Sequence, residues 1–315
     1  MMYQVLTATE GLSYGDWLSF RRLGIGGSDA SIVCGVNRYT SSIELWMDKT
    51  GQFPCQEAGE PAYWGQQLES LVKTEFTKRT GIEVTPVHQI LQSETYPFML
   101  ANLDGICECS KHGTCVFEAK TASAFKSSEW DNKIPPEYML QVQHYMAVTG
   151  YKGTYIAVLI GGNQFDWRFI ARDDELIDML IQLEHDFWEH VKTKIPPIPD
   201  GSEASAKFLN ELFPESIEKS QIPLPDEAVG LICQYDNACE QLERYTEQKR
   251  EAENLLKLML GKNENGTSGN NVLTWKTVTQ EHLDTKAFKE EHPGLFLKYT
   301  KQATHRRFSI KHEEE

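Results

Sequence analysis

The spacing of apolar residues along the chain predicts helices first and strands after them. Where apolar side chains recur every three or four residues, we expect helices over residues 14–22, from Ser41 to near Gly51, and over 62–80. The period then changes to two, which is typical of half-buried strands, near residues 82–91, 98–109 and 114–121. The first half of the chain is therefore expected to contain both kinds of element.

The pattern continues in the same way to about residue 194. Pro135 and Pro136 begin a helix that Gly150 ends, because proline suits a first helical turn and glycine a C-terminal cap. Two strands, 154–162 and 164–172, and a helix over 173–194 follow. The order of helices and strands predicts an α/β fold, with a mixed central sheet flanked by helices.

A change in composition marks a boundary near residue 198. Residues 195–205 are rich in proline, serine and glycine, so we expect one domain over residues 1–198 and a C-terminal helical extension over 199–315. Within it, residues 227–260 form a long polar helix with larger apolar residues at Leu231, Tyr235, Leu242, Tyr245, Leu255, Leu256 and Met259. These positions are too irregular to predict a coiled coil, although the helix could mediate assembly or bind a protein partner.

The end of the extension is expected to hold a flexible loop over 261–271, a strand over 272–278 and a short helix capped by Asp284. A basic tail strand follows, with charges at Lys298, Lys301, Arg306, Arg307 and Lys311. Two interpretations of this tail stay open: it contacts DNA phosphates, or it is a solvated edge strand.

Composition and charge restrict the function without deciding it. The net charge of −15 weighs against general nucleic-acid binding but allows a local basic channel and an acidic metal site. No apolar run is long enough to cross a membrane, and the N-terminus lacks the features of a secretory signal. Seven irregularly spaced cysteines suit a reducing cytoplasm better than a disulfide framework.

Some cysteines and histidines could suggest a metal centre of another kind. Cys107, Cys109, His112 and Cys115 lie close together, but their spacing matches no standard zinc or iron–sulfur site. We interpret the stretch as the turn of a hairpin. His144 and His185 lie in expected helices and are interpreted as packing or surface residues.

Acidic residues and a lysine on two neighbouring strands form the strongest chemical signal. Glu118 and Lys120 lie two residues apart in an expected strand, so their side chains point to the same face. If that strand pairs with 98–109 as a hairpin, Asp104 comes close to Glu118. Two converging carboxylates favour magnesium or manganese between them, and a lysine there can orient or help deprotonate a water. The alternative is a surface hairpin with an ordinary ion pair.

Two helices bring further polar groups towards the same sheet. Glu69 lies on or beside the buried face of the helix 62–80, where an unpaired carboxylate is costly. Gln141 lies in the packing stripe of the helix that Pro136 begins. Each could singly be a satisfied core residue, but together they supply a third acid and an amide.

The run of Asp104, Glu118-x-Lys120 and Gln141 resembles the PD-(D/E)XK nuclease superfamily, although Leu103 stands where its name has proline. More narrowly, five segments over roughly residues 13–195 resemble YqaJ-type phage recombinase nucleases, relatives of lambda exonuclease. These segments are RRLGIGGSDAS, WGQQLESLVKTEF, LDGICE, FEAKTAS and YMLQVQHYMAVTG. The resemblance implies a PD-(D/E)XK nuclease core followed by the C-terminal extension.

The resemblance also implies roles for single residues. Asp104, Glu118 and the backbone carbonyl of Ala119 would hold the main magnesium, Lys120 would act on the attacking water, Glu69 would help with a second ion and Gln141 would steady the water or Lys120. Arg21 and Ser28 look like the family's pocket for a 5′-phosphate. Without the resemblance, the glycine-rich turn before Ser28 would be interpreted as a helix cap, and Asp29 could cap a helix in either case.

The activity implied by the resemblance is magnesium-dependent 5′→3′ digestion of linear double-stranded DNA, which leaves a 3′ single strand for homologous annealing. Such relatives act as ring-shaped oligomers, often trimers, so we expect a ring, a possible single-strand annealing partner, and a bacterial cytoplasm with a phage or prophage origin. Two alternatives stay open: an endonuclease of the same superfamily, and a catalytically silent DNA-binding or assembly module.

Overall fold

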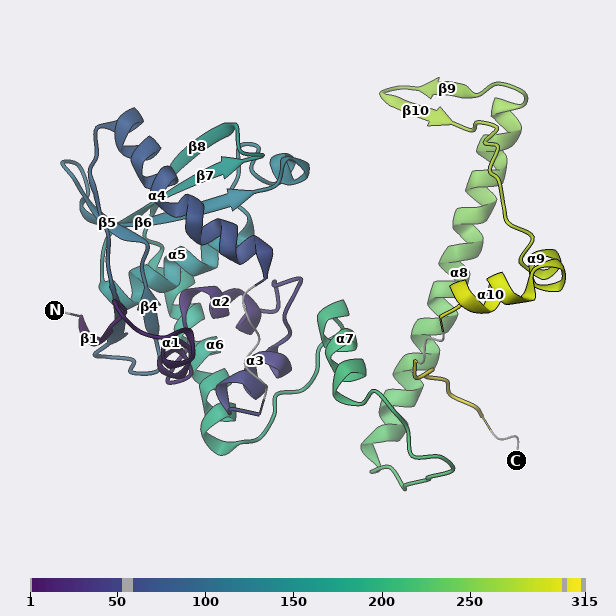
Figure 1. The fold of residues 1–315 in the computed structure, drawn as a ribbon, viewed down its shortest axis with the longest axis horizontal. Coiled ribbons are helices and arrows are strands. Elements are labelled where there is room, and N and C mark those ends of the chain that lie inside the picture. Colours follow the sequence, from purple (N-terminus) through teal and green to yellow (C-terminus); the bar gives the residue numbers. More distant parts are fainter. Residues whose placement is uncertain (1, 53–58, 302–304, 313–315) are drawn as a thin grey trace. The chain divides into compact units, whose positions relative to one another are not determined.

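A five-stranded sheet with the strand order β2-β5-β6-β7-β8 forms the centre of the N-terminal part of the chain (Figure 1). The structure is a computed structural model that describes residues 2–52, 59–301 and 305–312. The strands are β2 (Val84–Thr85), β5 (Gly105–Cys109), β6 (Gly113–Ala122), β7 (Gly153–Ile160) and β8 (Gln164–Ala171). Only β6 and β7 pair in parallel, so the sheet is mixed, which confirms the expected fold class.

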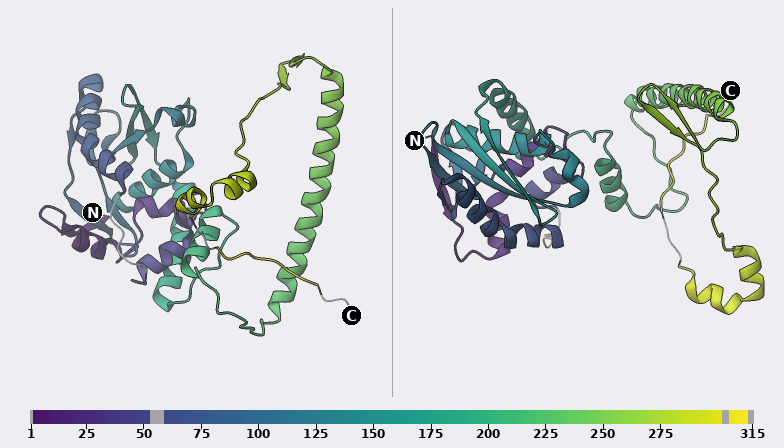
Figure 2. Two further views of the ribbon diagram at one scale, coloured as in Figure 1. Left: turned by 45° about the vertical axis from the view of Figure 1, so that its right-hand side comes forward. Right: turned by 90° about the horizontal axis from the view of Figure 1, so that it is seen from above.

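Helices cover both faces of this sheet, as Figure 2 shows from two further directions. Helix α4 (Glu60–Thr80) packs Val72 and Phe76 against Phe117 on one face. Helix α5 (Pro136–Thr149) packs against the other face, and α6 (Asp174–Thr193) lies against α5. Because both faces are covered, β7 has an almost continuous apolar sequence, GTYIAVLI, rather than an alternating one.

A second sheet, in the order β1-β3-β4, lies beside the first. Its strands are β1 (Tyr3–Ala8), β3 (Gln89–Ser93) and β4 (Leu100–Asn102). The strand expected over 82–91 is therefore wrong as one element: it divides into β2 and β3 around Pro86, which has no N–H to donate to a ladder. β1 was not expected at all.

The strand expected over 98–109 also divides into two, β4 and β5. The break falls at Leu103 and Asp104, where the Asp104 carboxylate accepts a hydrogen bond from the backbone N–H of Ala119 at 2.8 Å. The backbone pairing of β5 with β6 ends at Phe117, and two residues further along β6 the N–H of Ala119 bonds to the Asp104 side chain instead of to a neighbouring strand of the hairpin. The pairing of β5 with β6 confirms the expected hairpin, and the break leaves Asp104 between the two sheets.

Caps fix several helix ends at or near the expected residues. Ser41 accepts a hydrogen bond from the N–H of Glu44 and begins α3 (Ser42–Lys49), while Gly81 and Gly150 end α4 and α5 with φ of 72° and 74°. Asp173 caps α6 in the same way as Ser41 caps α3. Three shorter elements complete the first part: α1 (Tyr14–Arg21), α2 (Gly27–Val33) and the 3₁₀ helix η1 (Ala124–Glu129).

The chain divides into two compact units, Met1–Leu212 and Phe213–Glu315. The division falls after Leu212 rather than after residue 198, because α7 (Glu203–Leu212) buries Ala204 and Phe208 and contacts α3. The expected domains 1–198 and 199–315 are corrected to that extent.

The second unit contains α8 (Glu227–Leu260), the hairpin of β9 (Asn265–Ser268) and β10 (Asn271–Thr274), α9 (Thr285–Glu291) and α10 (Pro293–Tyr299). Asp284 caps α9 as expected, and α8 has the expected bounds. The loop expected over 261–271 instead contributes β9, the strand expected over 272–278 ends at Thr274, and the tail residues 305–312 form no strand. Among the described helices, none is long and apolar enough to cross a membrane.

Candidate active site

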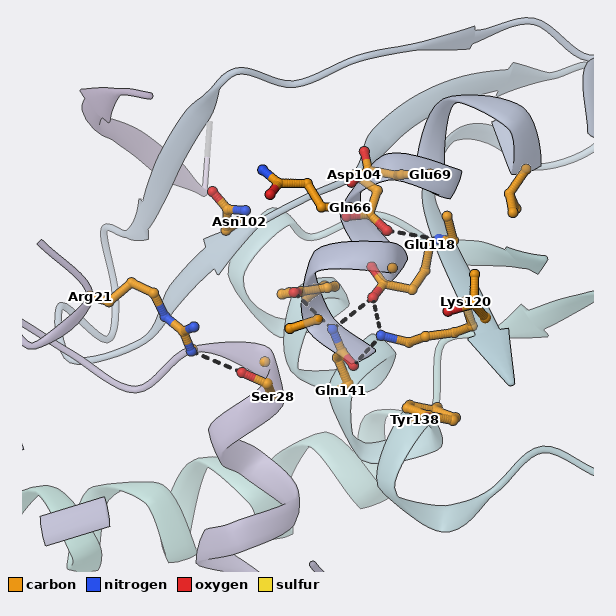
Figure 3. A pocket seen from close by; sticks show the side chains of 18 of the residues that line it. Arg21, Ser28, Gln66, Glu69, Asn102, Asp104, Glu118, Lys120, Tyr138 and Gln141 are labelled. Atoms are coloured by element: carbon orange, nitrogen blue, oxygen red, sulfur yellow. Dashed lines mark hydrogen bonds and ion pairs between the residues drawn. The ribbon is translucent and has the colours of Figure 1, made fainter. Parts of the chain in front are cut away.

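Asp104, Glu118 and Lys120 line one pocket of about 570 Å³, together with Glu69 and Gln141 from the two helices that cover the sheet (Figure 3). Glu118 is only 2% exposed, and its Oε1 accepts a hydrogen bond from Lys120 Nζ at 2.6 Å. The two side chains share a face of β6, as their spacing predicted. The structure thus brings together the five side chains that the sequence proposed as catalytic.

Gln141 links the acid to the lysine. Its Nε2 donates to Glu118 Oε1 at 2.7 Å and to the Tyr145 hydroxyl at 3.0 Å, while its Oε1 accepts from Lys120 Nζ at 2.9 Å. The Lys120 ammonium also lies 4.8 Å from the ring centroid of Tyr138, within cation–π range. Lys120 is therefore held from three sides and points into the pocket.

The second oxygen of Glu118 has no such partner. Oε2 is buried without a hydrogen-bond partner within the described chain, which is costly for a carboxylate oxygen. The pKa of Asp104 is raised well above its ordinary value by burial, then by the charge of Glu118 and then by that of Glu69. Burial likewise raises the pKa of Glu118, although Lys120 opposes the shift. A divalent cation would relieve both conditions, so the residues present fit a hard, oxygen-binding metal.

The protein side chains do not form a complete cage. Within residues 2–52, 59–301 and 305–312, no group of three or more His, Cys, Asp or Glu side chains is arranged to hold a metal ion. Magnesium commonly binds through one or two carboxylates and keeps its other positions for water and phosphate oxygens. Two converging acids beside an open pocket fit that mode of binding.

The pKa of Lys120 is raised. Burial alone would lower it, but the carboxylates of Glu118 and Asp104 outweigh burial. The side chain is therefore an ammonium at neutral pH, a donor that can hold a water or a phosphate oxygen.

Glu69 lies at the edge of this group. Its carboxylate forms an ion pair with Lys73, one turn later on α4, and its side chain is 30% exposed. It lines the same pocket as Asp104 and adds negative charge there. Glu69 thus lies beside the buried face of α4, where the helical spacing of the apolar residues placed it.

At the other end of the pocket, Arg21 and Ser28 lie side by side. Arg21 is the last residue of α1, and its Nη2 donates to Ser28 Oγ at 2.9 Å. Trp17, one turn earlier, has its ring 5.0 Å from the Arg21 guanidinium carbon. The predicted pair thus forms, and it offers guanidinium and hydroxyl donors to an anion.

Asp29 and Lys49 form a buried pair beneath Arg21. Lys49 Nζ lies 2.7 Å from Asp29, their side chains are 2% and 7% exposed, and Arg21 approaches Asp29 at 3.2 Å. Burial alone would raise the pKa of Asp29, but Lys49 and then Arg21 lower it to about 2. Asp29 also accepts from the N–H of Gly26 and caps α2, as expected. Burial lowers the pKa of Lys49, and the charge of Asp29 opposes that shift. Two basic side chains thus face one carboxylate.

The glycine-rich turn is fixed by close backbone contacts. Ile25 exchanges backbone hydrogen bonds with Phe98 and Leu100 beside β4, and a Cβ on Gly24 would lie 2.6 Å from the Phe98 carbonyl oxygen. A Cβ on Gly27 would lie 2.4 Å from the ring of Tyr145. Tyr145 therefore contacts both the glycine-rich turn and Gln141, so one side chain joins the two ends of the pocket.

Several pocket residues were missed by the sequence analysis. These are Trp17, Gln66, Asn102 and Tyr138 in the lining, with Lys49 and Lys73 as ion-pair partners. Helical spacing from Glu69 and Gln141 could have indicated Gln66 and Tyr138. Nothing in the local sequence indicates that Lys49 is buried, since its partner is twenty residues away.

The cysteine-rich stretch forms the expected hairpin. Cys107 and Cys115 are buried opposite each other on β5 and β6, and Cys109 accepts a hydrogen bond from the Tyr155 hydroxyl at 3.2 Å. His112 instead stacks on Phe169 at a centroid distance of 4.0 Å. His144 is also a packing residue, buried between Glu184 and the carbonyl of Leu100, whereas the side chain of His185 is half-exposed.

Comparison with known structures gives limited similarity. An alkaline exonuclease from Laribacter hongkongensis aligns with a TM-score of 0.49 and 21% identity, over 63% of this chain and 99% of that one. A phage-related exonuclease from Haemophilus somnus 129PT aligns with a TM-score of 0.43 and 13% identity, over 57% of this chain and 99% of that one.

Sequence comparison is more decisive. The uncharacterized protein YqaJ of Bacillus subtilis (strain 168) is 41% identical over 98% of this chain and 97% of its own length. Residues 16–152, which include every proposed site residue, match the model of the YqaJ-like viral recombinase domain. The chain therefore belongs to the YqaJ-like viral recombinase family.

Proposed function

We propose that the protein is a magnesium-dependent exonuclease that digests linear double-stranded DNA from the 5′ end. One observation carries this proposal: a single pocket joins a converging acid pair and a lysine ammonium to an arginine–serine anion site. Cleavage of a phosphodiester requires charge stabilisation at the phosphate and a positioned water, and both needs have candidate groups here. Membership in a viral recombinase family supports DNA as the substrate.

The acids define where metal would bind. Asp104, Glu118 and the backbone carbonyl of Ala119 would hold the main magnesium ion, and Glu69 would help to hold a second; manganese has the same ligand preference. When bound, the metal supplies positive charge that stabilises the transition state at the phosphate. The unpartnered Glu118 Oε2 supports this assignment.

The remaining side chains act on water and on the DNA. Lys120, as an ammonium, orients the attacking water and a phosphate oxygen, and Gln141 fixes Lys120 through the hydrogen bond at 2.9 Å. Arg21 and Ser28 bind the 5′-phosphate at the far end of the pocket. Recognition of a terminal phosphate beside the scissile bond would make the enzyme dependent on a free end.

The product of such digestion is a 3′ single strand, the substrate for homologous recombination by annealing. We propose this role together with a ring-shaped oligomer, a trimer in particular, that encloses the duplex, and a single-strand annealing protein as partner. The setting would be the cytoplasm of a bacterial host that carries the phage or prophage.

The experiment is digestion of 5′-phosphorylated linear duplex DNA in magnesium, in manganese and in EDTA, with covalently closed circular DNA beside it. Release of mononucleotides from the linear duplex alone, starting at 5′-labelled ends and abolished by EDTA, supports the proposal. Cutting of the circle would support the endonuclease alternative. Binding without hydrolysis under either ion would support the silent module.

A further inference from the structure

Helix α8 of the second unit carries a regular stripe that its larger apolar residues alone do not reveal. When alanines and one lysine are included, positions alternate at spacings of three and four from residue 228 to residue 259, as in a heptad repeat. We call these residues the α8 seam: Ala228, Leu231, Tyr235, Ala238, Leu242, Tyr245, Lys249, Ala252, Leu256 and Met259. The larger apolar residues alone look irregular because they include Leu255, which lies outside the seam, and leave out the alanines and Lys249.

The large residues of the α8 seam are exposed. Leu242 is 69% exposed, Tyr245 64% and Met259 79%, and only Leu260 is buried along the described α8. Tyr235 meets the ring of Phe308 from the C-terminal tail at a centroid distance of 5.8 Å. A 34-residue helix with such a stripe gains most of its stability from a partner surface, because helix propensity alone contributes little.

We propose that the partner is the α8 of a second copy of this chain, packed antiparallel. In an antiparallel pair of helices, a positions of one helix face d positions of the other. The α8 seam then forms complementary layers: Ala228 with Met259, Leu231 with Leu256, Tyr235 with Ala252, Ala238 with Lys249, and Leu242 with Tyr245. Three of the five layers join an alanine to a larger side chain, which fills space evenly.

The two-fold axis implied by these layers passes between Glu243 and Arg244. That point is the midpoint of α8, whose bounds are Glu227 and Leu260, so the two helices overlap along their full length of about 51 Å. The seam and the helix bounds are separate observations, and they give the same axis.

Charge favours the same arrangement. The first half of α8 contains only acidic charges, Glu227, Asp236, Glu240 and Glu243. The second half contains four basic residues, Arg244, Lys249, Arg250 and Lys257, against three acids, Glu247, Glu251 and Glu253. Antiparallel packing places the acidic half of each helix beside the more basic half of its partner.

A parallel pair lacks both kinds of complementarity. It places Lys249 against Lys249 inside the seam and sets the two acidic halves side by side, which repels. It also opposes Tyr235 to Tyr235 and Ala238 to Ala238, so that crowded layers alternate with empty ones.

Substitution on and off the seam tests the pairing in the full chain. Each pair of helices contains two Leu242–Tyr245 layers, one on each side of the axis, so Leu242→Glu places a charge in both. Leu258→Glu is the control, because Leu258 is 79% exposed but lies outside the seam. Because an antiparallel pair has two-fold symmetry, it joins two of the proposed rings to each other. Light scattering should therefore show that Leu242→Glu halves the molar mass in solution while Leu258→Glu leaves it unchanged. Helix content by circular dichroism should fall in Leu242→Glu, where α8 loses its partner, and stay unchanged in Leu258→Glu. A monomeric unsubstituted chain, or equal effects of the two substitutions, would overturn the proposal.

Crosslinking tests the direction. Cys233 and Cys239, both exposed on α8, are first replaced by serine. A chain with Tyr235→Cys is then mixed with a chain with Ala252→Cys and treated with a short thiol crosslinker. Crosslinks between the two different chains, well above those within either chain alone, support the antiparallel pair. Preferential links from residue 235 to residue 235 indicate a parallel pair, and a monomer that recruits another protein indicates a different partner; both outcomes reject the proposal.

Discussion

Replacement of Lys49 by methionine tests which contacts hold the Arg21–Ser28 end of the pocket in place. Methionine keeps much of the length of lysine but removes the charge that lies 2.7 Å from Asp29. Since both side chains are almost fully buried, the carboxylate would keep Arg21, at 3.2 Å, as its remaining cationic partner, beside the hydrogen bond from the Gly26 N–H. Breaking a buried ion pair from one side costs about 3–5 kcal/mol of unfolding free energy. For a unit of this size, that corresponds to a fall in Tm of about 6–20 °C.

The pKa of Asp29 gives a second measure of the same pair. Its folded value of about 2 lies below the ordinary 3.8, so the ionised form stabilises the fold by about 2 kcal/mol. That contribution is complete above pH 3.8 and is lost as the pH falls towards 2. In Lys49→Met, burial still raises the pKa of Asp29, but the Lys49 charge that lowered it is gone, so the pKa rises. Protonation of Asp29 at lower pH then removes the unpaired buried charge that destabilises the variant.

The assay is thermal and urea unfolding of both chains between pH 7 and pH 4. The stability gap should be largest at pH 7 and should narrow towards pH 4, and adding Asp29→Asn to Lys49→Met should recover part of the loss. A gap below about 1 kcal/mol at pH 7, the size of an exposed ion pair, would show that the buried pair does not hold this part of the fold. So would a gap that does not change with pH.

Three further predictions concern the pocket itself. Arg21→Ala should reduce the preference for 5′-phosphorylated over 5′-hydroxyl ends about 10- to 100-fold, because it removes a charged hydrogen-bond donor; competition digests of the two substrates measure this. Gly27→Ala should cost about 1–3 kcal/mol in unfolding experiments and lower activity, since its Cβ would lie 2.4 Å from Tyr145. Gly26→Ala, whose Cβ would lie 3.3 Å from the end of the Arg21 side chain rather than against a ring, is the milder control. Asp104→Asn should raise Tm in EDTA, because it removes one of two mutually repelling acids. It should also abolish the increase in Tm that magnesium causes in the unsubstituted chain, because it removes a proposed metal ligand. Equal magnesium-induced increases in Tm in both chains would count against the metal assignment.

The sequence was most informative where local rules act alone. Ser41, Gly81 and Gly150 mark helix ends through hydrogen bonds and backbone angles that involve only near neighbours. The spacing of Glu118 and Lys120 placed both on one strand face for the same reason. These features needed no knowledge of the tertiary structure.

Prediction failed where a distant contact decides the outcome. The alternating pattern continues through Leu103 and Asp104, so it gives no sign that β4 ends at Asn102 and β5 begins at Gly105. The break depends on the hydrogen bond from the Ala119 N–H to Asp104, which joins residues far apart in the sequence. The unit boundary extends to Leu212 because α7 packs on α3, a contact that composition does not record. Lys49 likewise looks like a surface residue in the sequence. It is buried because its partner Asp29 lies on another helix, which the local sequence does not reveal.

Mononucleotide release from 5′-phosphorylated linear duplex by the unsubstituted chain and by Lys120→Ala shows whether this pocket carries out hydrolysis. Both are assayed in magnesium under single-turnover conditions, with their Tm values compared as a control for folding. We predict release that depends on magnesium and falls at least about 100-fold in Lys120→Ala, because the substitution removes the group proposed to orient the water and stabilise charge. A folded Lys120→Ala chain that digests DNA at close to the original rate would contradict the assignment of this pocket as the active site.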